Sequence, residues 1–131
     1  MAMPEETRKK LLKLIDQVAD IERKRLDIRR ERESIFERTR VIRAQLVLDI
    51  ASARDDRGRP RYPNEQTREA ALTLKLAEHE EWRRLSDRLR KLYEEDDLLA
   101  IEHNRLADRK AVSMMEMGLA ASPDGPLEGG R

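Results

Sequence analysis

The chain contains no cysteine among its 131 residues, and only 3% of those residues are aromatic. Without cysteine it has neither a disulfide framework nor a thiolate ligand for a metal. A compact globule of this length usually fills its core with aromatic and β-branched side chains, so their scarcity argues against one. The missing cysteine also fits an intracellular protein, and we expect a cytoplasmic location.

Long apolar runs are absent too. No stretch of about 18 apolar residues exists, so the sequence predicts no membrane-spanning helix and no membrane partner. The first ten residues lack the apolar segment of a secretory signal.

Proline and glycine are missing from two stretches, residues 5–57 and 64–117. Charged residues make up 42% of the chain, with 28 Lys and Arg against 27 Asp and Glu. This composition is typical of long helices or coiled coils. Disorder is the competing interpretation of such high charge, and the regular apolar spacing described next argues against it.

The first stretch has a heptad pattern. Its apolar positions alternate in steps of four and three, which predicts a coiled-coil helix from about residue 4 to about residue 53. Pro4, Glu5 and Glu6 suit the first turn of a helix. One column holds Leu14, Ile21, Ile28, Ile35 and Ile42, and the other holds Leu11, Val18, Arg25, Arg32, Thr39 and Leu46.

Residues 54–63 predict a turn, because Gly58, Pro60 and Pro63 all interrupt helices. Asn64 is a good N-cap for a second helix over about residues 64–117, and Gly118 is its expected C-cap. We expect residues 118–131 to form a flexible tail.

The second helix has a seam of its own, although Leu72 and Leu76 lie out of phase with it, which predicts a shift in register. The seam consists of Trp82, Leu85, Leu89, Leu92, Asp96, Leu99, His103 and Leu106.

The two seams match when the second helix runs antiparallel to the first. Residue numbers that add up to 120 or 121 then pair Leu14 with Leu106 and Ile21 with Leu99, and the midpoint falls at Pro60 inside the turn. The same register sets Arg25 opposite Asp96, the expected structural core pair, as half-buried charges require. The sequence thus predicts an all-α fold, an antiparallel two-helix coiled-coil hairpin over residues 1–117.

Several apolar residues lie off the seam and imply a second apolar surface. We expect the hairpin to form a homo-oligomer, with a dimer in the form of a four-helix bundle. The alternative is that these residues only widen the intrachain stripe. They are Ile15, Leu26, Phe36, Val41, Val47, Leu48, Tyr93, Leu98 and Ile101.

Residue patterns for catalysis are missing, since the chain has no phosphate-binding glycine loop and no zinc-protease motif. We therefore expect no enzyme activity, no catalytic residue, no cofactor and no metal site. His79 and His103 lie too far apart on one helix to share a metal. His103 and the seam arginines Arg25 and Arg32 are interpreted as polar layers that set the register, although the arginines would also suit a basic groove for phosphates.

The turn is the most distinctive part of the sequence. Arginines and one tyrosine on a protruding turn can contact phosphates and stack on a base. They would equally suit an acidic protein surface or a merely soluble loop, and the sequence leaves the three readings open. The candidate binding residues are Arg54, Arg57, Arg59, Arg61, Tyr62 and Arg68.

The turn also carries a motif, Gly-x-Pro-x-Tyr-x-Asn with an arginine four residues later, formed by Gly58, Pro60, Tyr62, Asn64 and Arg68. In this motif and in its helix–turn–helix layout the chain resembles a group of small uncharacterised phage and prophage proteins. The resemblance implies an accessory role near DNA recombination or replication. In architecture alone, the chain is also similar to the Gam-like proteins, helical-hairpin dimers that bind duplex DNA ends.

From these patterns we expect a non-enzymatic, oligomeric helical-hairpin interaction or scaffold protein, an accessory factor of a DNA recombination or replication assembly. The alternative is direct nucleic-acid binding through the arginine-rich turn. The expected partners are accordingly a second copy of the chain and either a nucleic acid or a DNA-processing protein.

Overall fold

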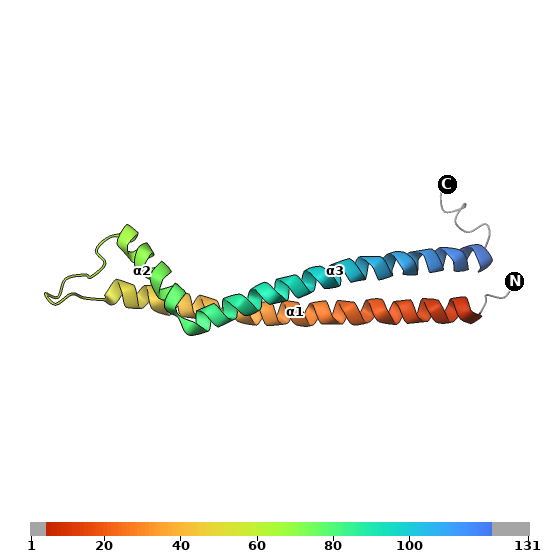
Figure 1. The fold of residues 1–131 in the computed structure, drawn as a ribbon, viewed down its shortest axis with the longest axis horizontal. Helices are drawn as coiled ribbons and strands as arrows, with labels where there is room; N and C mark the ends of the chain where they lie inside the picture. Colours follow the sequence, from red (N-terminus) through yellow and green to blue (C-terminus); the bar gives the residue numbers. More distant parts are fainter. Residues whose placement is uncertain (1–4, 122–131) are drawn as a thin grey trace. The chain divides into compact units, whose positions relative to one another are not determined.

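The computed structural model describes residues 5–121, and their side chains from 5 to 118. It contains three helices, α1 (Glu5–Ser52), α2 (Glu65–Glu78) and α3 (Glu80–Ala121), and no strand within the described range (Figure 1). The predicted all-α class is confirmed. The chain divides into two compact units: the terminal unit (Met1–Asp27 and Glu95–Arg131) and the loop unit (Ile28–Glu94).

Helix α1 is continuous over 48 residues and ends within one residue of the predicted position. Glu5 and Glu6 occupy its first turn, where negative charge stabilises the exposed backbone N–H groups. Charged residues recur throughout the helices. Within residues 5–121, no helix has an apolar stretch long enough to cross a membrane.

The core of the terminal unit is formed by side chains of α1 and α3. Val18, Ile21 and Leu106 are buried against one another, and Leu14 and Leu99 pack around them. These five residues occupy predicted seam positions on α1 and α3. Burying one such side chain fully contributes about 1.5–3 kcal/mol, so the seam accounts for the packing of these two segments.

The loop unit continues the same α1 column. Ile28, Ile35 and Ile42 are buried at heptad spacing, and Leu92 of α3 is only 1% exposed. Helix α2 adds Ala71, which is also buried.

The predicted single helix over residues 64–117 is wrong, because it is interrupted at His79, which separates α2 from α3. The His79 backbone is extended, with φ −78° and ψ 113°. Its N–H donates to the Leu76 carbonyl at 3.2 Å and closes α2, while its carbonyl accepts from the Arg83 N–H at 3.0 Å and opens α3. The ring Nδ1 accepts from the Trp82 N–H at 3.1 Å, so the imidazole caps α3.

This interruption explains why Leu72 and Leu76 lie out of phase with the seam of residues 82–106. A register shift within one long helix was predicted instead. The two leucines belong to a separate helix, α2. Glu80 and Glu81 in the first turn of α3 add the negative charge that favours a helix start.

The end of α3 also differs from the prediction. The helix passes through Gly118 and ends at Ala121, so Gly118 is not its C-cap. In the described range only Gly58 has the positive φ that a left-handed cap requires. The rest of the predicted tail, residues 122–131, lies outside the described residues.

Replacing the capping imidazole tests the origin of the break. We expect His79→Ala to lower the free energy of unfolding by about 0.5–2 kcal/mol, because the Trp82 N–H loses its acceptor. His79→Asn should retain most of the stability, since asparagine is a good N-cap. Urea titrations followed by circular dichroism measure the difference. An alanine variant as stable as the parent would show that the imidazole does not hold the break.

Candidate functional site

The loop between α1 and α2 is built as a tight hairpin. The Asp55 N–H donates to the Arg59 carbonyl at 2.8 Å, and the Gly58 N–H donates to the Asp55 carbonyl at 3.0 Å. Arg54 and Pro60 form an antiparallel bridge. Gly58 has φ +76°, the left-handed conformation that closes three-residue hairpin loops and that residues with a Cβ rarely adopt.

The Asp55 carboxylate holds this hairpin from inside. Its Oδ1 accepts from the backbone N–H groups of Arg57 and Arg59, both at 2.9 Å. The carboxylate therefore fixes the backbone of two arginines. Their guanidinium groups are left to extend from an ordered turn.

The start of α2 fixes the other side of the loop. Asn64 Oδ1 accepts from the Thr67 N–H at 2.8 Å, and Thr67 Oγ1 accepts from the Asn64 N–H at 3.4 Å, which completes a capping box. Arg68 Nε donates to the Tyr62 carbonyl at 3.0 Å, and its Nη2 donates to the Pro63 carbonyl at 3.4 Å. Arg68 thus ties the loop to the helix.

The motif of the turn accordingly has structural roles. Gly58 supplies the positive φ, Asn64 caps α2, and Arg68 donates to two loop carbonyls. These motif residues hold the backbone of the loop in place. A protein that shares the motif would therefore be expected to share the shape of the turn. The guanidinium groups of Arg57, Arg59 and Arg61 take no part in these hydrogen bonds, which use only the backbone of Arg57 and Arg59. Their side chains are therefore left for binding.

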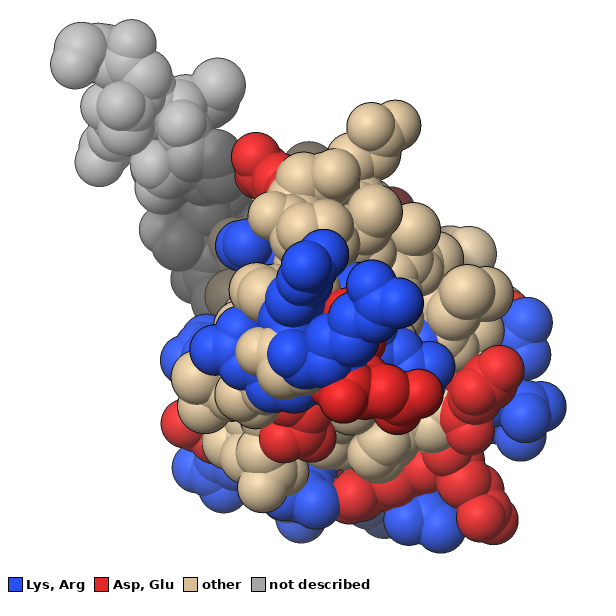
Figure 2. Space-filling model, turned by 90° about the vertical axis from the view of Figure 1, so that its left-hand side faces the viewer, with Lys and Arg blue, Asp and Glu red and all other residues tan. Residues whose placement is uncertain are grey.

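Five of the six predicted binding residues are exposed: Arg54, Arg57, Arg59, Arg61 and Arg68. None of their guanidinium groups forms an ion pair within the described part of the chain. The Arg61 guanidinium lies 5.8 Å from the centre of the half-buried Tyr62 ring. Figure 2, drawn from the side on which the loop lies in Figure 1, shows basic side chains gathered in the middle of the face with acidic ones beside them.

A hollow of about 490 Å³ lies beside this loop, and the sequence did not predict it. Arg61 and Tyr62 line one side, and Leu74 and Lys75 of α2 line another. Leu74 is exposed although it is a large apolar residue. Leu74 and Tyr62 line the same hollow, and the sequence analysis did not place Leu74 in a separate helix. The hollow adds an apolar surface to the basic loop.

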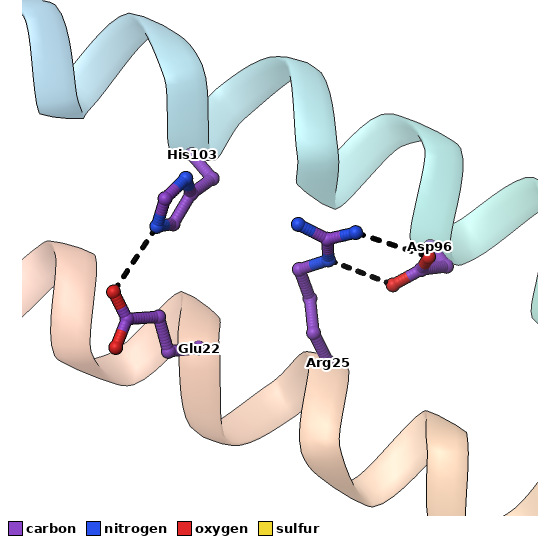
Figure 3. Close-up of polar contacts among 4 residues, drawn as sticks. All are labelled: Glu22, Arg25, Asp96 and His103. Carbon is purple, nitrogen blue, oxygen red and sulfur yellow. Dashed lines mark hydrogen bonds and ion pairs between the residues drawn. The ribbon is translucent and has the colours of Figure 1, made fainter.

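The predicted Arg25 and Asp96 pair is in contact in the terminal unit (Figure 3). Arg25 Nε donates to Asp96 Oδ1 at 2.9 Å and Nη2 donates to Oδ2 at 3.3 Å. The two side chains are 34% and 20% exposed, so the pair is half-buried. The hydrogen bond to Asp96 raises the pKa of Arg25, burial opposes this, and the charges of Asp96 and Asp97 add to the rise.

His103 lies in the same unit, where its Nε2 is 3.1 Å from Glu22 Oε1 (Figure 3). The contact joins α3 to α1 and adds a second polar layer beside Arg25 and Asp96. Within residues 5–118, no three acidic or histidine side chains are grouped closely enough to hold a metal ion.

Arg32, the second seam arginine, has a different environment in the loop unit. Its guanidinium lies 4.3 Å from the centre of the Tyr93 ring, a cation–π contact. Its Nε is buried without a hydrogen-bond partner among the described residues. The predicted register, in which paired residue numbers add up to 120 or 121, places Leu89 opposite Arg32. It does not reveal Tyr93, which lies beside the seam.

Two further ion pairs join α1 to α3 in the loop unit. Arg88 Nε lies 2.6 Å from Glu31 Oε2, and Arg38 Nη2 lies 2.7 Å from Glu81 Oε1. The hydrogen bond from Arg88 lowers the pKa of Glu31, and that from Arg38 lowers the pKa of Glu81, in each case against a smaller effect of burial. Both pairs are largely exposed, so each contributes little to stability.

Comparison of the chain with protein-family models, with curated proteins and with solved structures finds no match. Function is therefore argued from the side chains. The loop offers positive charge and one aromatic ring on an ordered backbone, and it contains no serine, histidine or cysteine between residues 53 and 64. Such a surface is chemically suited to anions.

The two lowered carboxyl pKa values predict a pH dependence of stability. A carboxylate whose pKa is lower in the folded chain stabilises it above the ordinary pKa, and this stabilisation is lost as the pH falls through the lowered value. We expect the Glu31→Gln/Glu81→Gln variant to lose less stability than the parent between about pH 5 and about pH 3. Urea titrations across that range measure it. Asp87→Asn is the control, since its ion-pair partner, Arg90, lies on the same helix; equal pH profiles for all three proteins would contradict the assignment.

Proposed function

We propose that the chain is an antiparallel helical hairpin that self-associates and acts as a non-enzymatic scaffold. The observation that carries this proposal is the exposure of large apolar side chains outside the seam. All nine off-seam residues named from the sequence are exposed by at least 39%. A wider intrachain stripe would have buried them, so their exposure favours an external partner.

The contacts within each unit support the hairpin. In the terminal unit Glu22 meets His103 and Arg25 meets Asp96, so numbers rise along α1 as they fall along α3. In the loop unit the pairs of Glu31 with Arg88 and Arg38 with Glu81 follow the same rule. One continuous α1 passes through both units.

Sedimentation equilibrium tests self-association. We expect the average mass to rise with protein concentration from 15.4 kDa toward twice that value, because apolar surface is removed from water on pairing. The rise should persist at high salt, which screens exposed charges and leaves apolar contacts intact. A mass that stays at 15.4 kDa at every concentration would overturn the proposal.

The second candidate function is direct binding of a nucleic acid by the loop. It is favoured by Arg57, Arg59 and Arg61, which form no ion pair with any described residue. Phosphate contacts make the affinity fall with salt, with a slope of about −0.9 per contact. A scaffold for a DNA-processing assembly, which the turn motif implies by resemblance, would instead contact its partner protein. The two functions differ in whether purified chain binds bare DNA.

The salt dependence of DNA affinity separates them. If the loop binds DNA, the Arg57→Ala/Arg59→Ala/Arg61→Ala variant should flatten the slope by up to about 2.7, the loss of three phosphate contacts. A control variant removes the same charge from exposed positions of α1, Arg29, Arg30 and Arg40. Fluorescence anisotropy with labelled duplex measures both. Equal effects of the two variants, or no binding at about 50 mM salt, would dismiss loop-mediated binding.

A further inference from the structure

The outer side of α3 carries large apolar residues that are mostly exposed. Leu98 is 68% exposed, Ile101 67%, Val112 55% and Met115 67%. All four belong to the terminal unit. Single exposed apolar residues are ordinary on protein surfaces, but four large ones on one side of one helix are not scattered.

These residues follow a heptad pattern of their own. Their spacing is three, then eleven, then three, and Arg105 and Asp108 fill the two heptad positions between them. Both polar residues are exposed as well. The complete set, here called the outer stripe, is Leu98, Ile101, Arg105, Asp108, Val112 and Met115.

Most of the outer stripe lies on the side of the helical wheel opposite the α3 residues that meet α1, although Asp108 and Val112 also border a hollow beside α1. Leu99 and Leu106 pack in the core of the unit, and His103 contacts Glu22. The helix therefore has two seams. One is closed within the chain, and the other is open to a partner.

The order of residue types along the outer stripe is palindromic in polarity and complementary in charge. Read from either end it is apolar, apolar, charged, charged, apolar, apolar, and the two central charges have opposite sign. A two-fold axis between residues 106 and 107 would align Leu98 with Met115 of a second copy and Ile101 with its Val112. Arg105 would then face Asp108 of the second copy, and this pair would occur twice.

The charges decide the direction of pairing. A parallel pair of outer stripes would set Arg105 against Arg105 and Asp108 against Asp108, two like-charged layers. The antiparallel pair gives two layers of opposite charge. On the flank of the stripe it also sets Glu102 opposite Arg109 of the second copy, which are again of opposite charge.

We propose that the outer stripe of α3 is the surface through which two copies of the chain associate, as an antiparallel and two-fold symmetric helix pair. This inference rests on the self-association proposed above and specifies its surface and direction. The stripe spans 18 residues, about 27 Å of helix, so the contact is small and the dimer reversible.

The charged neighbours of the central layers are compatible with this pairing. Arg105 Nη2 lies 2.8 Å from Glu102 Oε1 on its own helix, an exposed pair that holds the guanidinium near the stripe. Asp108 forms no ion pair among the described residues, so its carboxylate remains available. Asp108 and Val112 also line a hollow together with Lys10 and Lys13 of α1.

Charge reversal tests the surface and its direction together. Arg105→Asp gives like-charged layers in the antiparallel pair, and so does Asp108→Arg. We expect either variant to weaken dimerisation by at least about tenfold, because each introduces two repulsive contacts in one symmetric interface. An equimolar mixture of the two variants restores opposite charge in both layers, so the mixture should dimerise about as well as the parent.

The matched control is Arg90→Asp, which removes an exposed arginine from the same helix. Arg90 pairs with Asp87 three residues before it, as Arg105 pairs with Glu102. Sedimentation equilibrium measures all five samples, and circular dichroism confirms their helicity. Recovery in the mixture cannot arise from variants that fail to fold.

The outcomes distinguish this inference from the function on which it rests. The antiparallel outer stripe is supported if each single variant dimerises weakly, the equimolar mixture dimerises like the parent, and the control variant dimerises like the parent. If the parent dimerises and both charge-reversal variants dimerise equally well, the outer stripe is not the interface. Self-association then uses another face. A parent that stays monomeric overturns both.

Discussion

The burial of one narrow seam between α1 and α3 is the interaction on which the rest of the structure depends. Two helices can exclude water from only one side of each other, so the chain buries isoleucine and leucine at heptad spacing and leaves the other sides in water. Ile42 and Leu92 are 2% and 1% exposed, while large apolar residues elsewhere on the same helices remain exposed. The self-association proposed above would cover part of that exposed apolar surface.

Polar residues within and beside the seam give each unit its register. Arg25 meets a carboxylate on α3, whereas Arg32 meets the face of Tyr93. The same residue type at the same heptad position thus has two different partners. Because each partner fits only one alignment of the helices, these contacts select a register that leucine and isoleucine alone would leave open to slippage.

The heptad columns were enough to predict the helical class and most buried residues of α1, because periodic burial is visible in sequence. Ile50, which is 2% exposed, lies outside both predicted columns. The break at His79 could not be predicted in this way. Histidine can cap a helix through Nδ1, but it does not mark a helix end in the sequence as clearly as glycine or proline. The loop arginines were identified as candidates, but the roles of Asp55 and Arg68 depend on backbone hydrogen bonds that spacing does not reveal. Leu74 was missed for the same reason, because its position follows from the separate α2.

The most direct test of the paired seam measures proximity between α1 and α3 in solution. The chain has no cysteine, so nitroxide labels can be attached to cysteines introduced at Glu31 and Arg88, and in a second protein at Glu22 and His103. Each doubly labelled chain is diluted with excess unlabelled protein to remove contacts between copies. Antiparallel pairing predicts strong dipolar broadening of the electron paramagnetic resonance spectrum in both proteins, relative to their singly labelled forms. Spectra that equal the sum of the singly labelled forms would contradict the paired seam.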